Sequence, residues 1–152
     1  MQSKKLNFKN MNIDVLNNIL DLESYTSTHA WPKHSYEMAF RKHWRVVGAY
    51  ESDSLLGVIV YQMLFEQCTL MNLVVSSTSL KQGVATELIA TMFKDAKVNN
   101  CDSVFLEVRS DNKSAVSLYQ KVGFEIVNTR YGYYRYNNQS LDAYEMAIHL
   151  FS

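Results

Sequence analysis

The chain has 152 residues, of which 47% are hydrophobic and 20% charged, and its 15 basic residues balance 15 acidic ones. This size and composition predict one globular domain, residues 1–152, with a single core and no room for a second lobe. A formal charge of zero argues against a nucleic-acid-binding surface, and no apolar run approaches the roughly 20 residues that a membrane span needs.

The N-terminal third predicts a strand followed by two helices. Residues 6–8 alternate between apolar and polar as in a strand, and residues 11–25 carry apolar side chains at helical spacing. Pro32, the only proline, suits the entry to a second short helix near Ser35. The chain shows no apolar signal segment at its start, so we expect a cytoplasmic protein.

Three strand-like runs follow at residues 44–50, 55–65 and 68–75. Their connections are short, which predicts antiparallel neighbours. The remaining elements are expected at residues 83–98 (helix), 104–109 (strand), 112–122 (helix), 124–130 (strand) and 143–150 (strand), the last two flanking a tyrosine-rich segment. Gly123 suits the C′ position of the second of these helices. The expected fold class is α/β (α+β), with a mixed, mostly antiparallel sheet of about seven strands flanked by about four helices.

The segment Leu80–Thr86, LKQGVAT, joins a strand to an amphipathic helix. At such a junction, free backbone N–H groups and the helix dipole can hold a phosphate, and Gly83 permits close approach of a ligand to the backbone. The string is neither a Walker loop nor GxGxxG. Taken alone, it favours an ordinary strand-to-helix turn.

Glu107 is a carboxylate inside a β-rich run, on the same face as Phe105 and opposite Leu106. Two interpretations stand. The side chain is solvated near the strand end or paired with Arg109, or it is a general base, acting directly or through water, for an ammonium group that must lose a proton before attack.

Tyr119 shares the apolar stripe of its helix with Ala115, so packing alone explains its ring. Its phenol, with a reference pKa of about 10, is also matched to protonating a departing thiolate of pKa about 8.5. Asn112 is either the cap of that helix, with Asp111 as the competing cap, or a hydrogen-bond partner of a ligand.

Cys68 and Cys101 fall in different expected elements, without CxxC or Cys/His ligand spacing. We therefore expect two small buried thiols in a reducing compartment. The sequence predicts no metal site.

Read together, the run from Leu70 to Phe124 resembles the GNAT superfamily of acetyl-CoA-dependent N-acetyltransferases. Within it, the run resembles specifically the bacterial ribosomal-protein-alanine N-acetyltransferase (RimI) group. Residues 106–124 match the pattern LEVRxxNxxAxxLYxxxGF of that group. Its RxxYY and DAxxM tail patterns have counterparts in Arg130, Tyr133, Tyr134, Asp142, Ala143 and Met146.

The resemblance implies acetyl-CoA as the acetyl donor and no metal. It implies that the backbone of a splayed strand end holds the pantetheine arm and that the following loop wraps the pyrophosphate. The cofactor-binding residues implied are Leu73, Val74, Val75, Lys81, Gln82, Gly83, Val84, Ala85, Thr86 and Asn112.

For the chemistry, the resemblance implies Glu107 as general base and Tyr119 as general acid toward the CoA sulfur. Attack would be direct, in a ternary complex without a covalent acyl-enzyme. One departure concerns the group's QRRGxGR segment, because the chain lacks two of its three arginines and its second glycine. This departure predicts a smaller side-chain contribution to phosphate binding.

The implied acceptor is a protein N-terminus, such as that of a small-subunit ribosomal protein, with no nucleic-acid or membrane partner. Tyr133, Tyr134 and Asp142 would bind this substrate. Tyr131 and Tyr136 extend the tyrosine cluster, which either lines a peptide groove or consists of exposed strand residues. Two alternatives remain open: a small-molecule amine or amino-sugar acetyltransferase of the same fold, and a non-catalytic acyl-CoA-binding module.

Overall fold

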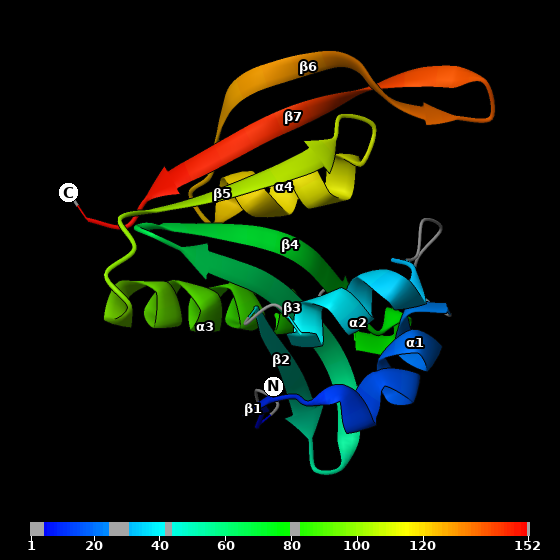
Figure 1. The fold of residues 1–152 in the computed structure, drawn as a ribbon, viewed down its shortest axis with the longest axis vertical. Helices are drawn as coiled ribbons and strands as arrows, with labels where there is room; N and C mark the ends of the chain where they lie inside the picture. The colour runs from blue at the N-terminus through cyan, green and yellow to red at the C-terminus, as the bar shows by residue number, and fades with distance from the viewer. Residues whose placement is uncertain (1–4, 25–30, 42–43, 80–82, 152) are drawn as a thin grey trace.

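The computed structural model describes residues 5–24, 31–41, 44–79 and 83–151. The elements in chain order are β1 (Asn7–Asn10), the 3₁₀ turn η1 (Ile13–Val15), α1 (Leu16–Ser24), α2 (Lys33–Arg41), β2 (Arg45–Glu51), β3 (Ser54–Leu64), β4 (Gln67–Val75), the 3₁₀ turn η2 (Ser77–Ser79), α3 (Val84–Val98), β5 (Ser103–Arg109), α4 (Lys113–Lys121), β6 (Glu125–Tyr136) and β7 (Gln139–His149). The seven strands form one sheet in the order β1-β2-β3-β4-β5-β7-β6 (Figure 1). Within the described ranges, β4–β5 is the only parallel pair, so the predicted fold class is confirmed.

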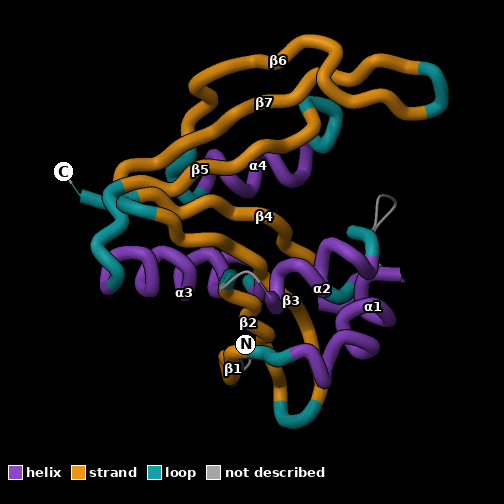
Figure 2. The backbone as a smooth tube through the Cα atoms, viewed as in Figure 1, coloured by secondary structure: helices purple, strands orange, loops and turns teal. Residues whose placement is uncertain are grey.

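The helices cover the two faces of the sheet in pairs (Figure 2). Alternating side chains of β3 show the division, since Ile59 and Tyr61 pack with α3 while Val58 and Val60 pack with α1 and α2. This alternation follows from the two-residue period of a strand. Both faces of the central strands are therefore buried.

Strands β4 and β5 pair only at their beginnings and then diverge (Figure 1). Their register covers Gln67 to Thr69 against Ser103 to Phe105. Beyond Thr69, β4 continues to pair with β3, and β5 continues to pair with β7. The two facing strand edges therefore separate and leave backbone N–H and C=O groups directed between them.

The C-terminal hairpin differs from the sequence prediction. The tyrosine-rich segment was expected to separate two short strands, but β6 and β7 run through it and turn only at Asn137–Asn138. Both asparagines have positive φ, 50° and 63°, which is the backbone of a two-residue hairpin turn. The turn needs only these two residues, so the flanking residues remain in the strands.

The N-terminal helix is also shorter than expected. Residues 13–15 form the 3₁₀ turn η1, capped by the Asn12 side chain, and the α-helix begins only at Leu16. Among the described residues, no helix has both the length and the apolar character that crossing a membrane requires.

Candidate active site

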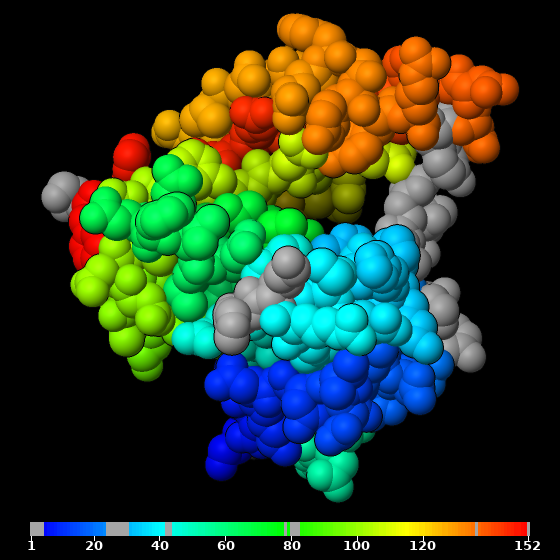
Figure 3. Space-filling model, in the orientation of Figure 1, coloured from blue at the N-terminus to red at the C-terminus, as the bar shows by residue number. Residues whose placement is uncertain are grey.

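The divergence of β4 and β5 opens two cavities, of about 520 Å³ and about 470 Å³. The first, called here the β5 cavity, is lined by Leu70–Leu73, Leu106–Arg109, Asp111, Asn112, Ala115, Tyr119 and Tyr134. The second, called here the α3 cavity, is lined by Leu73, Val75, Ser79, Gly83–Thr86, Asn112, Ser114, Ala115, Leu118, Tyr119 and Lys121. The two cavities adjoin because they share Leu73, Asn112, Ala115 and Tyr119. In Figure 3 the surface is hollowed between the orange β6–β7 hairpin and the cyan α2.

Glu107 lies on β5 with its side chain 31% exposed in the β5 cavity. Its Oε1 accepts a hydrogen bond of 3.0 Å from the Tyr134 hydroxyl, and its Oε2 lies 3.5 Å from Nη1 of Arg130. The expected alternative partner, Arg109, forms a bidentate pair with Asp111 at 3.0 and 2.7 Å. The carboxylate is thus held in the cavity by two residues of β6.

Arg130 also explains how two carboxylates can face each other across the sheet. Glu107 on β5 lies directly opposite Glu145 on β7, an arrangement that would be repulsive by itself. Arg130 lies between them, with its Nε 3.4 Å from Glu145. Its guanidinium also stacks over the Tyr133 ring at 4.3 Å, which fixes its position further.

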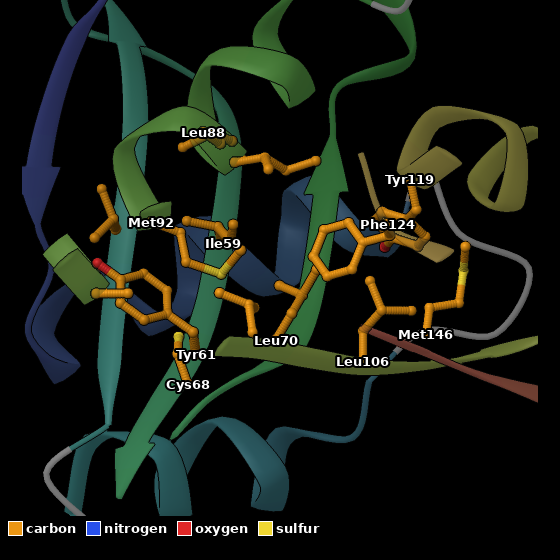
Figure 4. Packing of buried hydrophobic residues seen from close by; sticks show 14 of the residues in the cluster. Ile59, Tyr61, Cys68, Leu70, Leu88, Met92, Leu106, Tyr119, Phe124 and Met146 are labelled. Atoms are coloured by element: carbon orange, nitrogen blue, oxygen red, sulfur yellow. The ribbon is translucent and has the colours of Figure 1, made fainter. Parts of the chain in front are cut away.

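Tyr119 is buried, and its placement follows from the way α4 ends. The Phe124 N–H bonds the Tyr119 carbonyl and the Gly123 N–H bonds the Gln120 carbonyl, as in a Schellman motif. Gly123 has a φ of 112° at the predicted C′ position. The turn brings the Phe124 ring edge-on to the Tyr119 ring, 5.8 Å between centroids (Figure 4).

Burial raises the pKa of Tyr119 to about 12. The phenol is therefore a weaker acid than the reference value suggests, and it stays protonated at neutral pH. Packing and a donor role coexist here, because the ring belongs to the core while the residue lines both cavities.

Asn112 is the N-cap of α4, and its side-chain oxygen accepts a hydrogen bond from the Ala115 N–H at 3.3 Å. The capping prediction is confirmed, and Asn112 rather than Asp111 is the cap. Asn112 also lines both cavities, and a ligand contact through its NH₂ group stays a prediction.

The start of α3 has the features of an anion site. Gly83 precedes the helix with a φ of 82° and provides no side-chain cap, so the first backbone N–H groups of Val84–Thr86 are left for another acceptor. A side chain at Gly83 would meet no atom within 4 Å, which shows open space at this point. Lys81 and Gln82 lie outside the described residues.

Ser79 adds an observation that suits a bound cofactor. It is 1% exposed and lines the α3 cavity, and its hydroxyl has no hydrogen-bond partner among the described residues. A buried polar group without a partner is costly, and a polar ligand in the cavity would satisfy it. The residues present therefore fit a phosphorylated, amide-containing cofactor.

The predicted strand-end residues divide between two roles. Leu73 lines both cavities and Val75 lines the α3 cavity, whereas the Val74 side chain is buried among the α1 and α2 residues. Only the backbone of Val74 can face the opening between the strands, as expected for a strand that offers main-chain groups to a ligand.

The three predicted substrate-binding residues are not all brought together. Tyr134 lines the β5 cavity and contacts Glu107, but Tyr133 and Asp142 line neither cavity. Tyr133 packs against Tyr134 with 5.1 Å between ring centroids. Asp142 accepts a hydrogen bond of 2.9 Å from the Gly132 N–H, and this bond links β7 to β6 where the register of the hairpin shifts.

Three residues of the region were not singled out from the sequence: Asn72, Glu23 and Ser79. Asn72 lines the β5 cavity and donates hydrogen bonds to Tyr36 and Glu23. Its signal is a polar residue within the apolar run LMNLVV. Glu23 continues the helical spacing of Leu16 and Ile19, where an apolar residue would be expected.

Comparison with known proteins gives a consistent result. Residues 16–124 match the family model described as "Acetyltransferase (GNAT) family". The chain is 32% identical over 101 residues to a Haemophilus ducreyi protein named [ribosomal protein bS18]-alanine N-acetyltransferase, a match spanning 66% of this chain and 70% of that protein.

Two solved structures share the fold. The Escherichia coli ribosomal-protein-S18-alanine N-acetyltransferase superposes with a TM-score of 0.89 at 19% identity, over 96% of this chain and 94% of that one. Arabidopsis thaliana NAA60 in complex with acetyl-CoA superposes with a TM-score of 0.82 at 18% identity, over 95% and 98%.

Proposed function

The chain belongs to the acetyltransferase (GNAT) family, and from this premise we propose that it acetylates the N-terminal α-amine of a protein. It is an acetyl-CoA-dependent N-acetyltransferase. The protein acceptor is supported by the Haemophilus ducreyi relative, whose name specifies the alanine of ribosomal protein bS18. A small-subunit ribosomal protein is therefore the first acceptor to test.

The arrangement of the two cavities is the observation that carries this proposal. Tyr119 lines both, Glu107 lines only the β5 cavity, and the start of α3 lines only the α3 cavity. A donor held at α3 and an amine held at Glu107 would therefore meet beside Tyr119.

In this assignment, acetyl-CoA supplies the acetyl thioester, and the chain supplies binding and proton transfer. Glu107 accepts a proton from the amine through Oε1 or Oε2, directly or through water. Tyr119 donates from its hydroxyl toward the sulfur that leaves. The backbone edge of Leu73–Val75 orients the donor, and no side chain becomes acylated.

Two residues of β6 contact the Glu107 carboxylate. Tyr134 donates a hydrogen bond to this carboxylate, and Arg130 places a positive charge beside it. Burial and the adjacent Glu107 raise the pKa of Tyr134 to about 12, so this hydroxyl stays a donor to Glu107 throughout the neutral range.

The position of the cavity supports a peptide as the acceptor. Tyr134 of the β6–β7 hairpin lines one side of the β5 cavity, and Figure 3 shows the surface recessed between that hairpin and α2. A recess at the surface can admit the end of an extended chain, whereas a small amine needs a closed pocket for selectivity.

The test compares acceptors in one assay. The enzyme is mixed with acetyl-CoA and a peptide beginning with the N-terminal residues of bS18, and CoA release and the acetylated position are measured. The matched control is the same peptide with a formylated N-terminus. Acetylation confined to the free N-terminal amine is the expected result.

The small-molecule alternative is tested in parallel with polyamines and amino sugars. Turnover on one of these amines, with none on any peptide amine, overturns the proposed acceptor. Binding of acetyl-CoA without turnover on any amine would instead favour a non-catalytic acyl-CoA-binding module. Thermal stabilisation by acetyl-CoA reports this binding separately from turnover.

A further inference from the structure

Glu23, at the end of α1, is a carboxylate that is only 2% exposed. Its Oε1 accepts the Trp31 N–H at 2.7 Å, and its Oε2 accepts the Tyr36 hydroxyl at 2.5 Å. Burying a carboxylate is costly unless hydrogen bonds compensate for the lost water. An apolar residue would serve the core at lower cost, so the retained carboxylate calls for another role.

The protons in this group can be assigned one by one. The single hydroxyl proton of Tyr36 goes to Glu23, and burial together with this carboxylate raises the pKa of Tyr36, so the proton stays in place. The Tyr36 oxygen can then only accept a further hydrogen bond. The group 2.9 Å from it must therefore be the NH₂ of Asn72.

The assignment fixes which end of the Asn72 amide faces the opening. The nitrogen, Nδ2, is directed to Tyr36 and, at 3.4 Å, to Oε1 of Glu23. The oxygen, Oδ1, must lie on the opposite side of the amide. Among the described residues, no hydrogen bond reaches Oδ1.

A β-bulge directs Asn72 toward this network. Val60 of β3 pairs with Asn72 while the next residue, Tyr61, pairs with Leu70, so Met71 is an extra residue in β4. The bulge shifts the alternation of side chains, and Asn72 points to the α1 and α2 face. Bulges are frequent where a strand must redirect a side chain near an active site.

Asn72 and Glu107 line the same cavity from opposite strands, β4 and β5. An attacking amine needs its lone pair directed at the acetyl carbon, which requires its N–H groups to be held by acceptors elsewhere. Glu107 provides one acceptor on one wall. Asn72 lines the other wall, and the contacts of its Nδ2 with Tyr36 and Glu23 fix the orientation of its amide.

We propose that Asn72 Oδ1 accepts a hydrogen bond from the acceptor amine, and that Glu23 and Tyr36 are positioning residues that keep this oxygen directed into the cavity. The inference rests on the proposed function, because it assumes that the β5 cavity holds the amine. It adds a second contact to the amine, opposite Glu107, and a buried network that orients it.

Asn72→Leu tests the contact, because leucine has a similar size and no acceptor. With the amine that the wild-type enzyme acetylates, we expect kcat/KM to fall roughly 10- to 100-fold, the effect of losing one hydrogen bond to a polar or charged group. The dissociation constant for acetyl-CoA should stay unchanged. A kcat/KM within about twofold of wild type overturns the inference.

Glu23→Gln tests the orienting network. The oxygen of the glutamine side chain must accept the Trp31 N–H, so the NH₂ group of the glutamine faces Tyr36. The Tyr36 oxygen then accepts from this NH₂ group, and the Tyr36 hydroxyl donates its proton to Asn72. The Asn72 amide inverts and presents NH₂ to the amine. We expect a loss of kcat/KM comparable to that of Asn72→Leu.

A double-mutant cycle separates positioning from general structural damage. If Glu23 acts through Asn72, then Glu23→Gln adds no further loss to Asn72→Leu, whereas multiplied losses overturn the positioning role. If Glu23→Gln does not fold, Tyr36→Phe takes its place in the same cycle. Loss of stability without loss of kcat/KM in Tyr36→Phe also overturns the role.

Asp95→Asn is the matched control. Asp95 accepts the hydroxyl of the buried Tyr61 at 2.6 Å, the same kind of pair, but neither residue lines a cavity. This change should alter the unfolding free energy and leave kcat/KM unchanged. A loss of kcat/KM in Asp95→Asn equal to that in Glu23→Gln would overturn the positioning role of Glu23. Every variant is compared with wild type on whichever amine the wild-type enzyme acetylates. A failure of the Asn72 inference can therefore be distinguished from a failure of the proposed protein acceptor.

Discussion

Two neighbouring strand–loop–helix units, β4–α3 and β5–α4, border the cleft, and their helices begin differently. Helix α3 starts after Gly83 with no side-chain cap, whereas α4 starts with the Asn112 side chain on the Ala115 N–H. The uncapped helix offers its N–H groups to a ligand, and the capped helix has satisfied one of its own. The two units therefore differ in the backbone N–H groups that they leave for a ligand, and the β4–α3 unit is the one in which we expect an anion.

The largest expected effect comes from removing one hydroxyl of the β5–α4 unit. Tyr119→Phe should lower kcat about 10²- to 10⁴-fold, the usual contribution of a general acid, because the leaving sulfur loses its proton donor. The ring and its packing on Phe124 are retained, so the KM for acetyl-CoA should change little. Steady-state kinetics with both substrates varied measures the two effects, and a large rise in the acetyl-CoA KM would make the hydroxyl a binding contact.

Glu107→Gln tests the other chemical group of the same unit. We expect a loss of about 10²-fold at neutral pH, which becomes smaller as pH rises because more of the acceptor is already the free amine. The measurement is the pH profile of kcat/KM. A loss that is the same at every pH would indicate a positioning role.

Glu145→Gln is the matched control for that experiment. Glu145 is the second carboxylate partner of Arg130, but it lines neither cavity. Its removal should leave the pH profile intact. An equal loss in both variants would assign the effect to Arg130 rather than to the base.

The buried phenol of Tyr119 also predicts a pH dependence of stability. Its pKa is about 12 in the folded chain, against about 10 for an unfolded tyrosine. The stabilisation is therefore complete below pH 10 and lost as pH rises to 12, roughly 2 to 3 kcal/mol in total. Urea unfolding of wild type and Tyr119→Phe across this range measures the difference in their unfolding free energies. This difference should change between about pH 10 and pH 12, and a constant difference would contradict the raised pKa of Tyr119.

The end of α4 is expected to be more sensitive than the start of α3. Gly123 has a φ of 112°, and a Cβ there would lie 2.8 Å from Cδ1 of Ile148, whereas Gly83 faces open space. Gly123→Ala should cost about 2 kcal/mol of unfolding free energy and Gly83→Ala about 1 kcal/mol. Urea denaturation measures both, and an equal cost would mean that the Ile148 contact is relieved without strain.

The smallest predicted effect falls on the β4–α3 unit. Gly83→Asp places a negative charge where the anion is expected, and should weaken acetyl-CoA binding roughly two- to fivefold, measured by titration calorimetry. Gly83→Asn is the control of equal size and without charge, and asparagine tolerates positive φ. Equal affinity of the two variants would place the anion elsewhere.

Local signals in the sequence predicted the β5–α4 unit correctly. The position of Asn112 three residues before Ala115, and of Gly123 after the last turn, depends on hydrogen bonds within a few residues. The alternation that separates Glu107 from Leu106 depends only on the strand period. Such features are fixed by neighbours along the chain.

The surroundings of Glu107 were not predictable in the same way. Its partner Tyr134 lies 27 residues away, and the residue reaches Glu107 only because β6 pairs with β7 and β7 with β5. The register of β6 shifts between Arg130 and Tyr134, so no fixed period connects these residues. Arg109, the partner that the structural interpretation of Glu107 considered, is the nearest cation in sequence, and it forms an ion pair with Asp111.

The order of the elements, the caps of α4 and the acetyltransferase motif follow from the sequence alone, because they depend on short-range hydrogen bonding and on the periods of helix and strand. Tertiary structure alone decided that Asn72, Glu23 and Tyr36 meet beside the cleft. Their contact requires α1 and α2 to dock on the sheet and one extra residue to shift the register of β4. A bulge is a property of two paired strands, so neither strand's own sequence contains it.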